Sequence, residues 1–327
     1  MKALLCKHLG PADQLVVEEV AAEPLGPHAA RVKVAACGVN FPDTLVIEGK
    51  YQYKPEPPFS PGAEMAGTVI EVGEKVQGLK PGDAVMGVFS HGCYREEIVV
   101  PAAGLLPVPT GMPLDLAGVF PMAYGTSYHA FKQRARLQAG DSVLVLGAAG
   151  GVGLAAVELA KAMGASKVIA AVGSEDKFAV CKEHGADEVI NYKQGLKGPI
   201  KALTGGQGVD VIYDPVGGDL FDEIPSCLAW NGRVLIVGFA AGTIPQLPVN
   251  KLLIKGAAAV GVFWGAFAMR EADENRRNFE ELAALWEQGK LKPRISGRYR
   301  LEDVPQALAD LLARKAQGKL LVQVGDV

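Results

Sequence analysis

The residues best suited to chemistry form a glycine-rich run, Ala148-Ala149-Gly150-Gly151-Val152-Gly153. Residues 142–146 before it are nearly all apolar, as in a parallel strand buried on both faces, and residues 151–163 after it have helical periodicity. A strand, a glycine turn and a helix in this order indicate a dinucleotide-binding fingerprint, here with alanine in the first glycine position. Gly150 would let the backbone approach a pyrophosphate, and Gly153 would let the helix pack closely on the strand. The alternative is a tight turn that binds nothing.

The end of the next predicted strand bears on the choice of dinucleotide. Folds that prefer NAD place an acidic residue about 20 residues after the glycine turn, where it binds the ribose hydroxyls. Gly173 and Ser174 stand there instead, so no carboxylate repels a phosphate. Lys177 in the first helical turn opposes the helix dipole unless an anion binds beside it, which predicts a site for the 2′-phosphate of NADPH. Glu175 and Asp176 would then face solvent; the alternative is that Lys177 is an ordinary surface lysine.

Length and composition indicate a globular protein of about two domains. The chain has 327 residues, of which 49% are hydrophobic, and a formal net charge of −3, so no nucleic acid or anionic membrane is expected as a partner. The five cysteines lie far apart without a Cys-x-x-Cys pair, which argues against disulfides and a structural zinc site. The N-terminus lacks a signal-length apolar core, and no apolar run approaches the length of a membrane span. These features predict a cytoplasmic protein.

The order of the predicted elements indicates two domains of different type. Residues 1–110 are rich in short strand signals separated by Pro and Gly, which predicts a compact β body. Residues 113–139 are predicted to be helical. Strands and helices then alternate, which is typical of a doubly wound parallel α/β sheet. The predicted strands of this sheet are 141–147, 167–172, 188–191, 209–214, 233–238 and 257–263.

Beyond Gly265 the periodicity changes. Two helical stripes follow, one through Phe279 and one through Leu308, and each precedes a probable strand, at 294–300 and 319–324. The simplest interpretation is that this C-terminal piece returns to the β body. The β body is then discontinuous, and the dinucleotide-binding domain is an insertion.

Several short motifs, each weak alone, occur together in a specific order. They are Gly38-Val-Asn-Phe-Pro-Asp43, Pro61-Gly-Ala-Glu-Met-Ala-Gly67, Leu79-Lys-Pro-Gly-Asp83, Tyr124-Gly-Thr126, the Ala148–Gly153 turn, Tyr213-Asp-Pro-Val-Gly-Gly218 and Gly318-Lys319-Leu. With these motifs the chain resembles the medium-chain dehydrogenases/reductases, and within them the zinc-free quinone oxidoreductases related to zeta-crystallin. The resemblance implies a Rossmann domain over residues 123–265, inserted into a GroES-like catalytic domain formed by residues 1–122 and 266–327.

The resemblance also draws attention to ligands that are missing. Zinc alcohol dehydrogenases of the superfamily use a cysteine, a Gly-His-Glu triplet and a second cysteine around the catalytic metal. The matching positions hold Asn40, Ala63 and Met122, and only Glu64 remains. An amide, a methyl group and a thioether cannot replace the thiolates and imidazole that zinc requires. We therefore expect no metal, and we interpret nearby Cys37 as a buried structural thiol.

The candidate catalytic residues are Asn40, Asp43, Tyr51 and Glu64. Asn40 could donate to a carbonyl or to the cofactor, or could simply close a turn. Tyr51 matches the proton-donating tyrosine of enoyl reductases, although a half-buried loop aromatic is an equal alternative. A structural role is favoured for Asp43 and Glu64.

The cofactor-binding residues implied by the resemblance are drawn from both predicted domains. Thr126 resembles the threonine that contacts the nicotinamide carboxamide or ribose, and Tyr192 would lie beside the 2′-phosphate. The full predicted set is Asn40, Met122, Thr126, Ala149, Gly150, Gly151, Val152, Gly173, Ser174, Lys177, Tyr192, Val216, Gly238, Phe239, Phe263, Trp264 and Lys319.

The resulting functional prediction is an NADPH-dependent, metal-free reductase that transfers hydride to a quinone or another conjugated carbonyl. One alternative is an enone or enoyl thioester reductase, and another is a non-catalytic NADPH-binding protein with a structural or RNA-associated role, which the acidic charge balance disfavours. The segment 257–264 is the last predicted strand of the sheet and is too apolar for an exposed edge, which predicts a homodimer.

Overall fold

The structure is a computed structural model that describes residues 1–325; residues 326 and 327, which end the predicted segment 266–327, lie outside the described part. The chain forms two compact units. Unit 1 comprises Met1–Met122 and Pro293–Val327, and unit 2 comprises Ala123–Lys292. No helix within residues 1–325 is long and apolar enough to cross a membrane.

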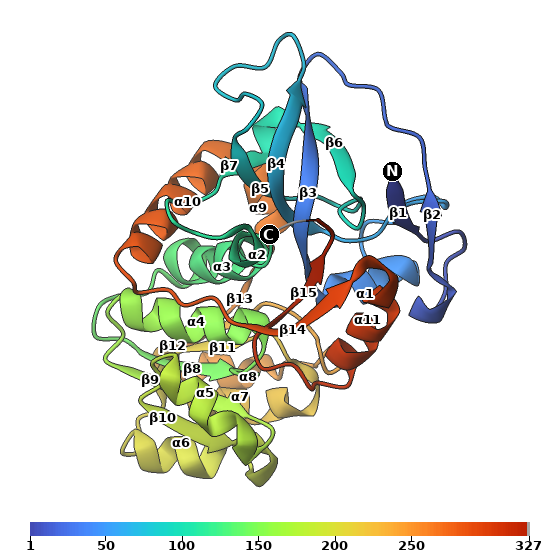
Figure 1. The fold of residues 1–327 in the computed structure, drawn as a ribbon. Helices are drawn as coiled ribbons and strands as arrows, with labels where there is room; N and C mark the ends of the chain where they lie inside the picture. Colours follow the sequence, from blue (N-terminus) through green and yellow to red (C-terminus); the bar gives the residue numbers. More distant parts are fainter. Residues whose placement is uncertain (326–327) are drawn as a thin grey trace. The chain divides into compact units, whose positions relative to one another are not determined.

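Unit 1 is built on a largely antiparallel sheet in which the C-terminal strand pairs with an N-terminal one (Figure 1). The pairing of Leu320 with Val39 joins β15 (Lys319–Gln323) to β3 (Ala29–Val39) and confirms the predicted return of the chain to the first body. The strands follow the order β14 (Ile295–Arg300), β15 (Lys319–Gln323), β3 (Ala29–Val39), β4 (Glu64–Val72), β5 (Ala84–Val88) and β7 (Leu105–Pro107), with β6 (Glu97–Pro101) pairing β3 and with β1 (Lys2–Leu5) and β2 (Val16–Glu19) forming a separate pair.

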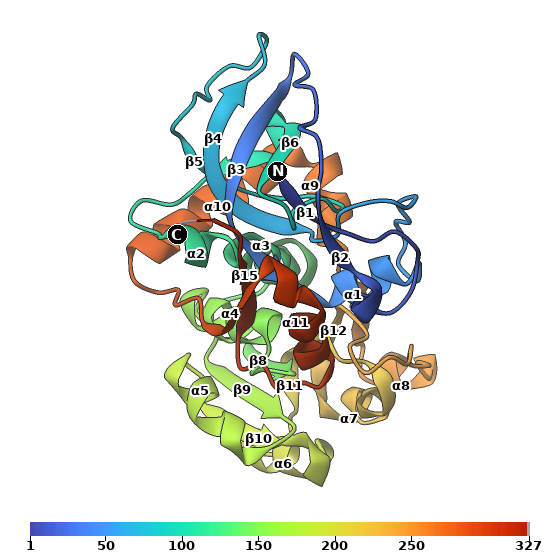
Figure 2. The same cartoon turned by 45° about the vertical axis from the view of Figure 1, so that its right-hand side comes forward.

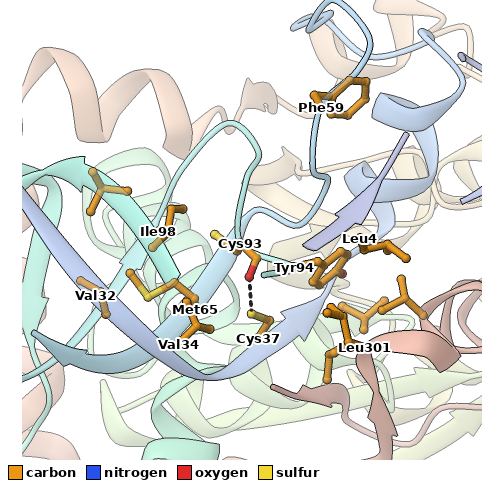
Figure 3. Close-up of a cluster of buried hydrophobic side chains, with 14 of the residues drawn as sticks. Leu4, Val32, Val34, Cys37, Phe59, Met65, Cys93, Tyr94, Ile98 and Leu301 are labelled. Carbon is orange, nitrogen blue, oxygen red and sulfur yellow. Dashed lines mark hydrogen bonds between the residues drawn. The ribbon is translucent and has the colours of Figure 1, made fainter. Parts of the chain in front are cut away.

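The core of unit 1 includes side chains of this sheet and contains three cysteines, Cys6, Cys37 and Cys93, of which Figure 3 labels the last two. Cys37 and Cys93 are fully buried, and the Cys37 thiol donates a 3.0 Å hydrogen bond to the Cys93 carbonyl oxygen. Burial raises the pKa of Cys37 well above its ordinary value, so this residue is a protonated structural thiol, as expected. The helices of unit 1 are α1 (Phe41–Ile47), α2 (Leu114–Ala117) and α11 (Val304–Leu312).

Unit 2 contains a six-stranded parallel sheet with the strand order expected of a doubly wound dinucleotide-binding fold. Its order is β10 (Glu188–Asn191), β9 (Lys167–Val172), β8 (Ser142–Leu146), β11 (Val209–Asp214), β12 (Leu228–Ile236) and β13 (Ala258–Gly261). The predicted fold class is therefore confirmed. The only boundary that moves substantially is the start of β12, which begins at Leu228 and shifts register against β11 between Val209 and Val211.

Both faces of the unit 2 sheet are covered, which explains its continuously apolar strands. Leu144 and Ile169 lie in a cluster with Ile200 of α6 (Lys197–Leu203) and Ile224 of α7 (Ile224–Cys227). Alternate residues such as Val143 point to the other face, where α4 packs on β8 and β9. Figure 2 shows α7 beside α8. The helices are α3 (Phe120–His129), α4 (Gly151–Ala162), α5 (Phe178–Glu183), α6 (Lys197–Leu203), α7 (Ile224–Cys227), α8 (Val249–Leu253), α9 (Trp264–Arg270) and α10 (Ala272–Glu287), and a π-helical stretch, Ala130–Ala135, continues α3.

The division into units agrees with the predicted boundary at residue 122 and differs at the second boundary. Residues 266–292, expected in the β body, belong to unit 2. The reason is side-chain packing between α10 and the α3 segment: the Lys132 ammonium binds the Glu281 carboxylate at 2.7 Å, and Gln133 donates to Asn278 at 3.0 Å. A helical stripe in the sequence does not reveal which body it packs on.

Candidate cofactor and active site

The glycine turn of unit 2 has the geometry that the fingerprint requires. Gly150 is the N-cap of α4, and Gly147 adopts a positive φ of 59° to turn the chain out of β8. A Cβ atom on Gly153 would lie 2.3 Å from the Gly147 carbonyl oxygen, so only glycine allows α4 to pack this closely on the strand. The N–H groups in the first turn of α4 lack intrahelical acceptors and can bind phosphate oxygens.

The ends of β9 and β10 bring two predicted cofactor residues together. A Cβ atom on Gly173 would lie 2.7 Å from the Tyr192 hydroxyl oxygen, so the tyrosine lies directly against the glycine. Glu175 and Asp176 are exposed, as expected. Ser174 precedes a 3-10 turn, Glu175–Lys177, rather than an α-helix, and its side chain makes no capping hydrogen bond.

Three more predicted residues follow β11 and β12, and one of them, Val216, lies against Gly147 at the start of the glycine turn. Val216 is buried, and a Cβ on Gly147 would lie 3.0 Å from it. Asp214 fixes this loop, because its Oδ1 accepts the N–H groups of Val216 at 2.8 Å and Gly217 at 2.9 Å. Burial raises the pKa of Asp214, although these hydrogen bonds act in the opposite direction. Gly238 and Phe239 follow β12, and the Phe239 ring lies against Gly217.

Trp264, by contrast, uses its side chain for packing inside unit 2. Its indole N–H donates to Asn275 at 2.9 Å, and its ring lies close to Gly125 and Phe279. The indole is only 6% exposed, whereas the neighbouring Phe263 is 56% exposed at the start of α9. If Trp264 contacts the cofactor, it would therefore do so through its backbone atoms.

In α3, Thr126 precedes Ser127, whose hydroxyl donates to the Val152 carbonyl oxygen at 3.1 Å. This bond ties α3 to the glycine turn. The remaining predicted residues of that turn, Ala149 and Gly151, lie at the start of α4.

In unit 1, Asn40, Glu64 and Lys319 form one buried polar cluster. The Asn40 amide donates to Glu64 Oε1 at 2.9 Å, and its oxygen accepts from the Lys319 ammonium at 2.6 Å. The ammonium also binds Glu64 Oε1 directly and donates to the Val39 carbonyl at 3.3 Å. The other oxygen of Glu64 accepts the Met122 N–H at 2.9 Å.

Gly38 makes room for this cluster. A Cβ atom at Gly38 would lie 2.0 Å from Glu64 Oε1, and the Gly38 carbonyl oxygen accepts the second amide hydrogen of Asn40 at 3.3 Å. Both N–H groups and the oxygen of the Asn40 amide are therefore used within unit 1.

Asp43 is held against this cluster by a residue that sequence reasoning missed. The Asp43 carboxylate accepts the Asn40 N–H at 2.9 Å and the Tyr94 hydroxyl at 2.9 Å. Burial raises the pKa of Asp43 to about 6, although the two hydrogen bonds and the Lys319 charge lower it. Tyr94 lies outside any strand of the sheet, so no periodicity in the sequence pointed to it.

Tyr51 is the polar candidate whose hydroxyl has no hydrogen-bond partner among residues 1–325. Its ring packs against the core of unit 1, and burial raises the pKa of its hydroxyl, with the nearby Asp43 charge acting in the same direction. Tyr53 is exposed and stacks on His91 with ring centroids 5.6 Å apart. A tyrosine with a raised pKa remains a proton donor at neutral pH.

The residues of this structure do not fit a zinc ion. Within the described part of the chain, no group of three or more His, Cys, Asp or Glu side chains is arranged to hold a metal. Ala63 offers no ligand atom, and Glu64 is already neutralised by Lys319.

Comparison with known proteins agrees with this architecture. Residues 26–110 match the alcohol dehydrogenase GroES-like domain and residues 151–285 the zinc-binding dehydrogenase domain. A quinone oxidoreductase-like protein 2 homolog of Nematostella vectensis is 42% identical over 325 residues, covering 98% of this chain and 88% of that protein. Among solved structures, a Pseudomonas syringae quinone oxidoreductase aligns with a TM-score of 0.92 at 31% identity over 98% of this chain and 99% of its own. The Escherichia coli quinone oxidoreductase complexed with NADPH has a TM-score of 0.90 at 28% identity, over 99% and 100% of the two chains.

The fold, the glycine turn of unit 2 and the polar cluster of unit 1 thus define an oxidoreductase of the medium-chain dehydrogenase/reductase type. Within that superfamily, the chain belongs to the quinone oxidoreductase family.

Proposed function

We propose that this protein binds NADPH and transfers hydride from its nicotinamide ring to a quinone or a related conjugated carbonyl, without a metal ion. The observation that carries the proposal is the glycine turn of unit 2, where Gly153 packs α4 onto β8 and leaves the first N–H groups of α4 for a pyrophosphate. The relatives with this architecture include a quinone oxidoreductase solved with NADPH.

The residues that would hold the cofactor in unit 2 are the N-terminal turn of α4, the Gly173–Tyr192 pair and the loop fixed by Asp214. NADPH supplies a hydride and needs no protein nucleophile. The absence of an acidic residue at Gly173 and Ser174 favours a 2′-phosphate, with Lys177 as its partner. Lys319, predicted as a cofactor residue, is already engaged with Glu64 and Asn40, and we propose that it contributes by fixing Asn40.

The same cluster supports the proposal that the enzyme needs no metal. Oxidising an alcohol requires stabilisation of a developing alkoxide, which zinc provides in the metal-dependent relatives. Here Glu64, the one residue of the zinc-ligand pattern that remains, is paired with the Lys319 ammonium. Reduction of an electron-poor acceptor is the chemistry that remains feasible. Elemental analysis showing stoichiometric zinc, with activity lost to a chelator and restored by zinc, would contradict this.

We assign any proton donation to Tyr51 rather than to Asn40, whose amide is fully used. A quinone accepts hydride at a position where solvent can quench the new charge, so Tyr51 would matter little. An enone or enoyl thioester, the alternative substrates, must be protonated on carbon, and general acid catalysis typically contributes about 10²–10⁴-fold. A protein that binds NADPH without turnover is the remaining alternative.

The decisive experiment measures kcat/KM with NADPH against a panel of quinones, enones and enoyl thioesters for the wild type, Tyr51→Phe and the control Tyr53→Phe. We expect quinones to give the highest value, and Tyr51→Phe to lose less than about tenfold with them. A loss of about 10²-fold or more, confined to Tyr51→Phe and to enoyl substrates, would favour the alternative reductase. No turnover with any acceptor would favour the binding protein.

A further inference from the structure

A buried carboxylate on the glycine-turn helix joins four segments of unit 2. Glu158 lies two turns after Gly150 in α4 and is only 4% exposed. Its Oε2 accepts the Tyr124 hydroxyl at 2.7 Å and the Lys292 N–H at 3.0 Å. Its Oε1 is 2.5 Å from Nδ1 of His184. Tyr124 and His184 are themselves buried.

The partners of Glu158 lie at the two ends of unit 2 and next to a predicted cofactor-binding segment. Tyr124 is the second residue of unit 2, and Lys292 is its last residue, so they mark where the chain enters and leaves the unit. His184 ends α5, the helix that follows the predicted 2′-phosphate segment. Glu158 belongs to α4, the helix of the glycine turn.

The three hydrogen-bond partners of Glu158 are all far from it in the sequence. Glu158 is separated from Tyr124 by 34 residues, from His184 by 26 and from Lys292 by 134. A carboxylate buried this deeply needs several good hydrogen bonds, because these offset the free-energy cost of removing the charge from water. A glutamate between Val157 and Leu159 in an apolar helix is therefore an unusual choice for packing alone.

We propose that Glu158 is a positioning residue that couples the two cofactor-binding helices of unit 2 to the two segments through which the chain enters and leaves that unit. NADPH bound at the start of α4 would then reduce the motion of Tyr124 and Lys292 without contacting them. By reciprocity, releasing these segments from Glu158 would weaken NADPH binding. This coupling rests on the proposed NADPH function.

The test uses Glu158→Met, which keeps the side-chain length and removes the acceptors, and Glu158→Gln, whose amide oxygen can still accept from Tyr124 and Lys292. Tyr124→Phe removes only the hydroxyl group, and with it the hydrogen bond to Glu158. Its matched control is Tyr128→Phe, which removes another tyrosine-to-glutamate hydrogen bond from the same helix, to Glu281 in α10. Hydrogen exchange by mass spectrometry follows the peptides around residues 120–126, 147–153 and 288–294, with and without NADPH.

For the wild type we expect NADPH to slow exchange in all three peptides. Glu158→Met should keep the protection at 147–153 under saturating NADPH, lose it at 288–294, and bind NADPH about tenfold more weakly, a typical size for coupling between sites. Glu158→Gln should restore most of both effects, and kcat at saturating NADPH should change less than twofold in Glu158→Gln and Tyr124→Phe.

Unchanged exchange at 288–294 in Glu158→Met, or equal effects of Tyr124→Phe and Tyr128→Phe, would overturn the proposal. If Glu158→Met does not fold, Tyr124→Phe against Tyr128→Phe decides the same question at 120–126. If the wild type fails to bind NADPH at all, the proposed function fails. Faster exchange at residue 292 in the cofactor-free Glu158 variants would still support the part of the proposal in which Glu158 holds the segment through which the chain leaves unit 2.

Discussion

At the scale of single residues, the polar cluster of unit 1 is closed by Lys319. Its ammonium has three N–H groups and three acceptors, from Val39, Asn40 and Glu64. The cluster therefore holds its side chains in one arrangement, which supports the proposal that any proton comes from Tyr51 rather than from Asn40. Lys319 and Glu64 are 255 positions apart in the sequence, so their pairing could not be predicted from spacing.

Asp43 should make stability depend on pH. Its pKa is raised to about 6 in the folded chain from 3.8, so the protonated form is favoured by folding, and the stability from this group is lost as pH rises through 6. The displacement corresponds to about 3 kcal/mol. In urea titrations, the free energy of unfolding of the wild type relative to Asp43→Asn should fall by about 2–3 kcal/mol between pH 4 and 7.

Tyr94→Phe is the control for this effect. It removes a hydrogen bond to the ionised form of Asp43, so the fall should move to higher pH. A difference between wild type and Asp43→Asn that stays flat with pH would show that Asp43 keeps an ordinary pKa.

Lys177 should decide the choice of dinucleotide. A charge-assisted contact contributes about 1.5–3 kcal/mol, so Lys177→Ala should weaken NADPH binding roughly 10- to 100-fold and leave NADH binding nearly unchanged. The matched control is Lys182→Ala, in α5, the helix that begins directly after Lys177. Binding titrations with NADPH and NADH measure both affinities. If the wild type prefers NADH, or if Lys177→Ala weakens the binding of both nucleotides equally, Lys177 is not the partner of the 2′-phosphate.

At the scale of elements, the two glycines of the turn have separable roles. A Cβ on Gly153 would meet backbone atoms of Gly147 and Ala148 at 2.3 and 2.8 Å, whereas a Cβ on Gly150 would meet only the Gly147 oxygen, at 3.3 Å. Gly153→Ala should force α4 away from β8 and lower stability by about 1–3 kcal/mol, as overpacking typically does.

Gly150→Ala serves as the comparison. It should keep the thermal midpoint within a few degrees of the wild type and chiefly weaken NADPH binding, because its side chain would occupy the space of the pyrophosphate. If both variants lost the same stability, the difference in backbone clearance would not control the packing of α4.

The elements that could be predicted from sequence are those whose signal is local. The strands of unit 2 and α4 carry continuous apolar or helical patterns, and, apart from the start of β12, they lie within a few residues of the expected bounds. The assignment of α10 to unit 2 could not be predicted, because it depends on contacts of Lys132 and Gln133 that no periodicity encodes. For the same reason the sequence drew attention to Asn40 and Glu64 but not to Tyr94 or Glu158.

At the scale of the molecule, β13 ends the sheet of unit 2, and within residues 1–325 it pairs only with β12. Its Ala258 and Ala259 are exposed, and the nearby side chains of Leu253 and Ile254 are 80% and 69% exposed. An apolar sheet edge of this kind tends to pair with another chain, which supports the proposal of a homodimer.

Val260→Lys should therefore convert a dimer into a monomer, because a charge on the edge strand opposes pairing. Light scattering at micromolar concentration measures the mass. The control is Ile70→Lys, which places the same charge at an exposed position of β4 in unit 1. A monomeric wild type, or an unaltered Val260→Lys dimer, would exclude this edge as the interface.

The burial of every thiol has a chemical consequence for a protein proposed to handle quinones. Quinones and enones are electrophiles that arylate or alkylate cysteine, and the thiolate is the form that attacks them. All five cysteines are buried, and burial raises the pKa of each, in Cys181 and Cys227 to about 12. We therefore expect the protein to resist covalent inactivation by the electrophilic acceptors proposed as its substrates.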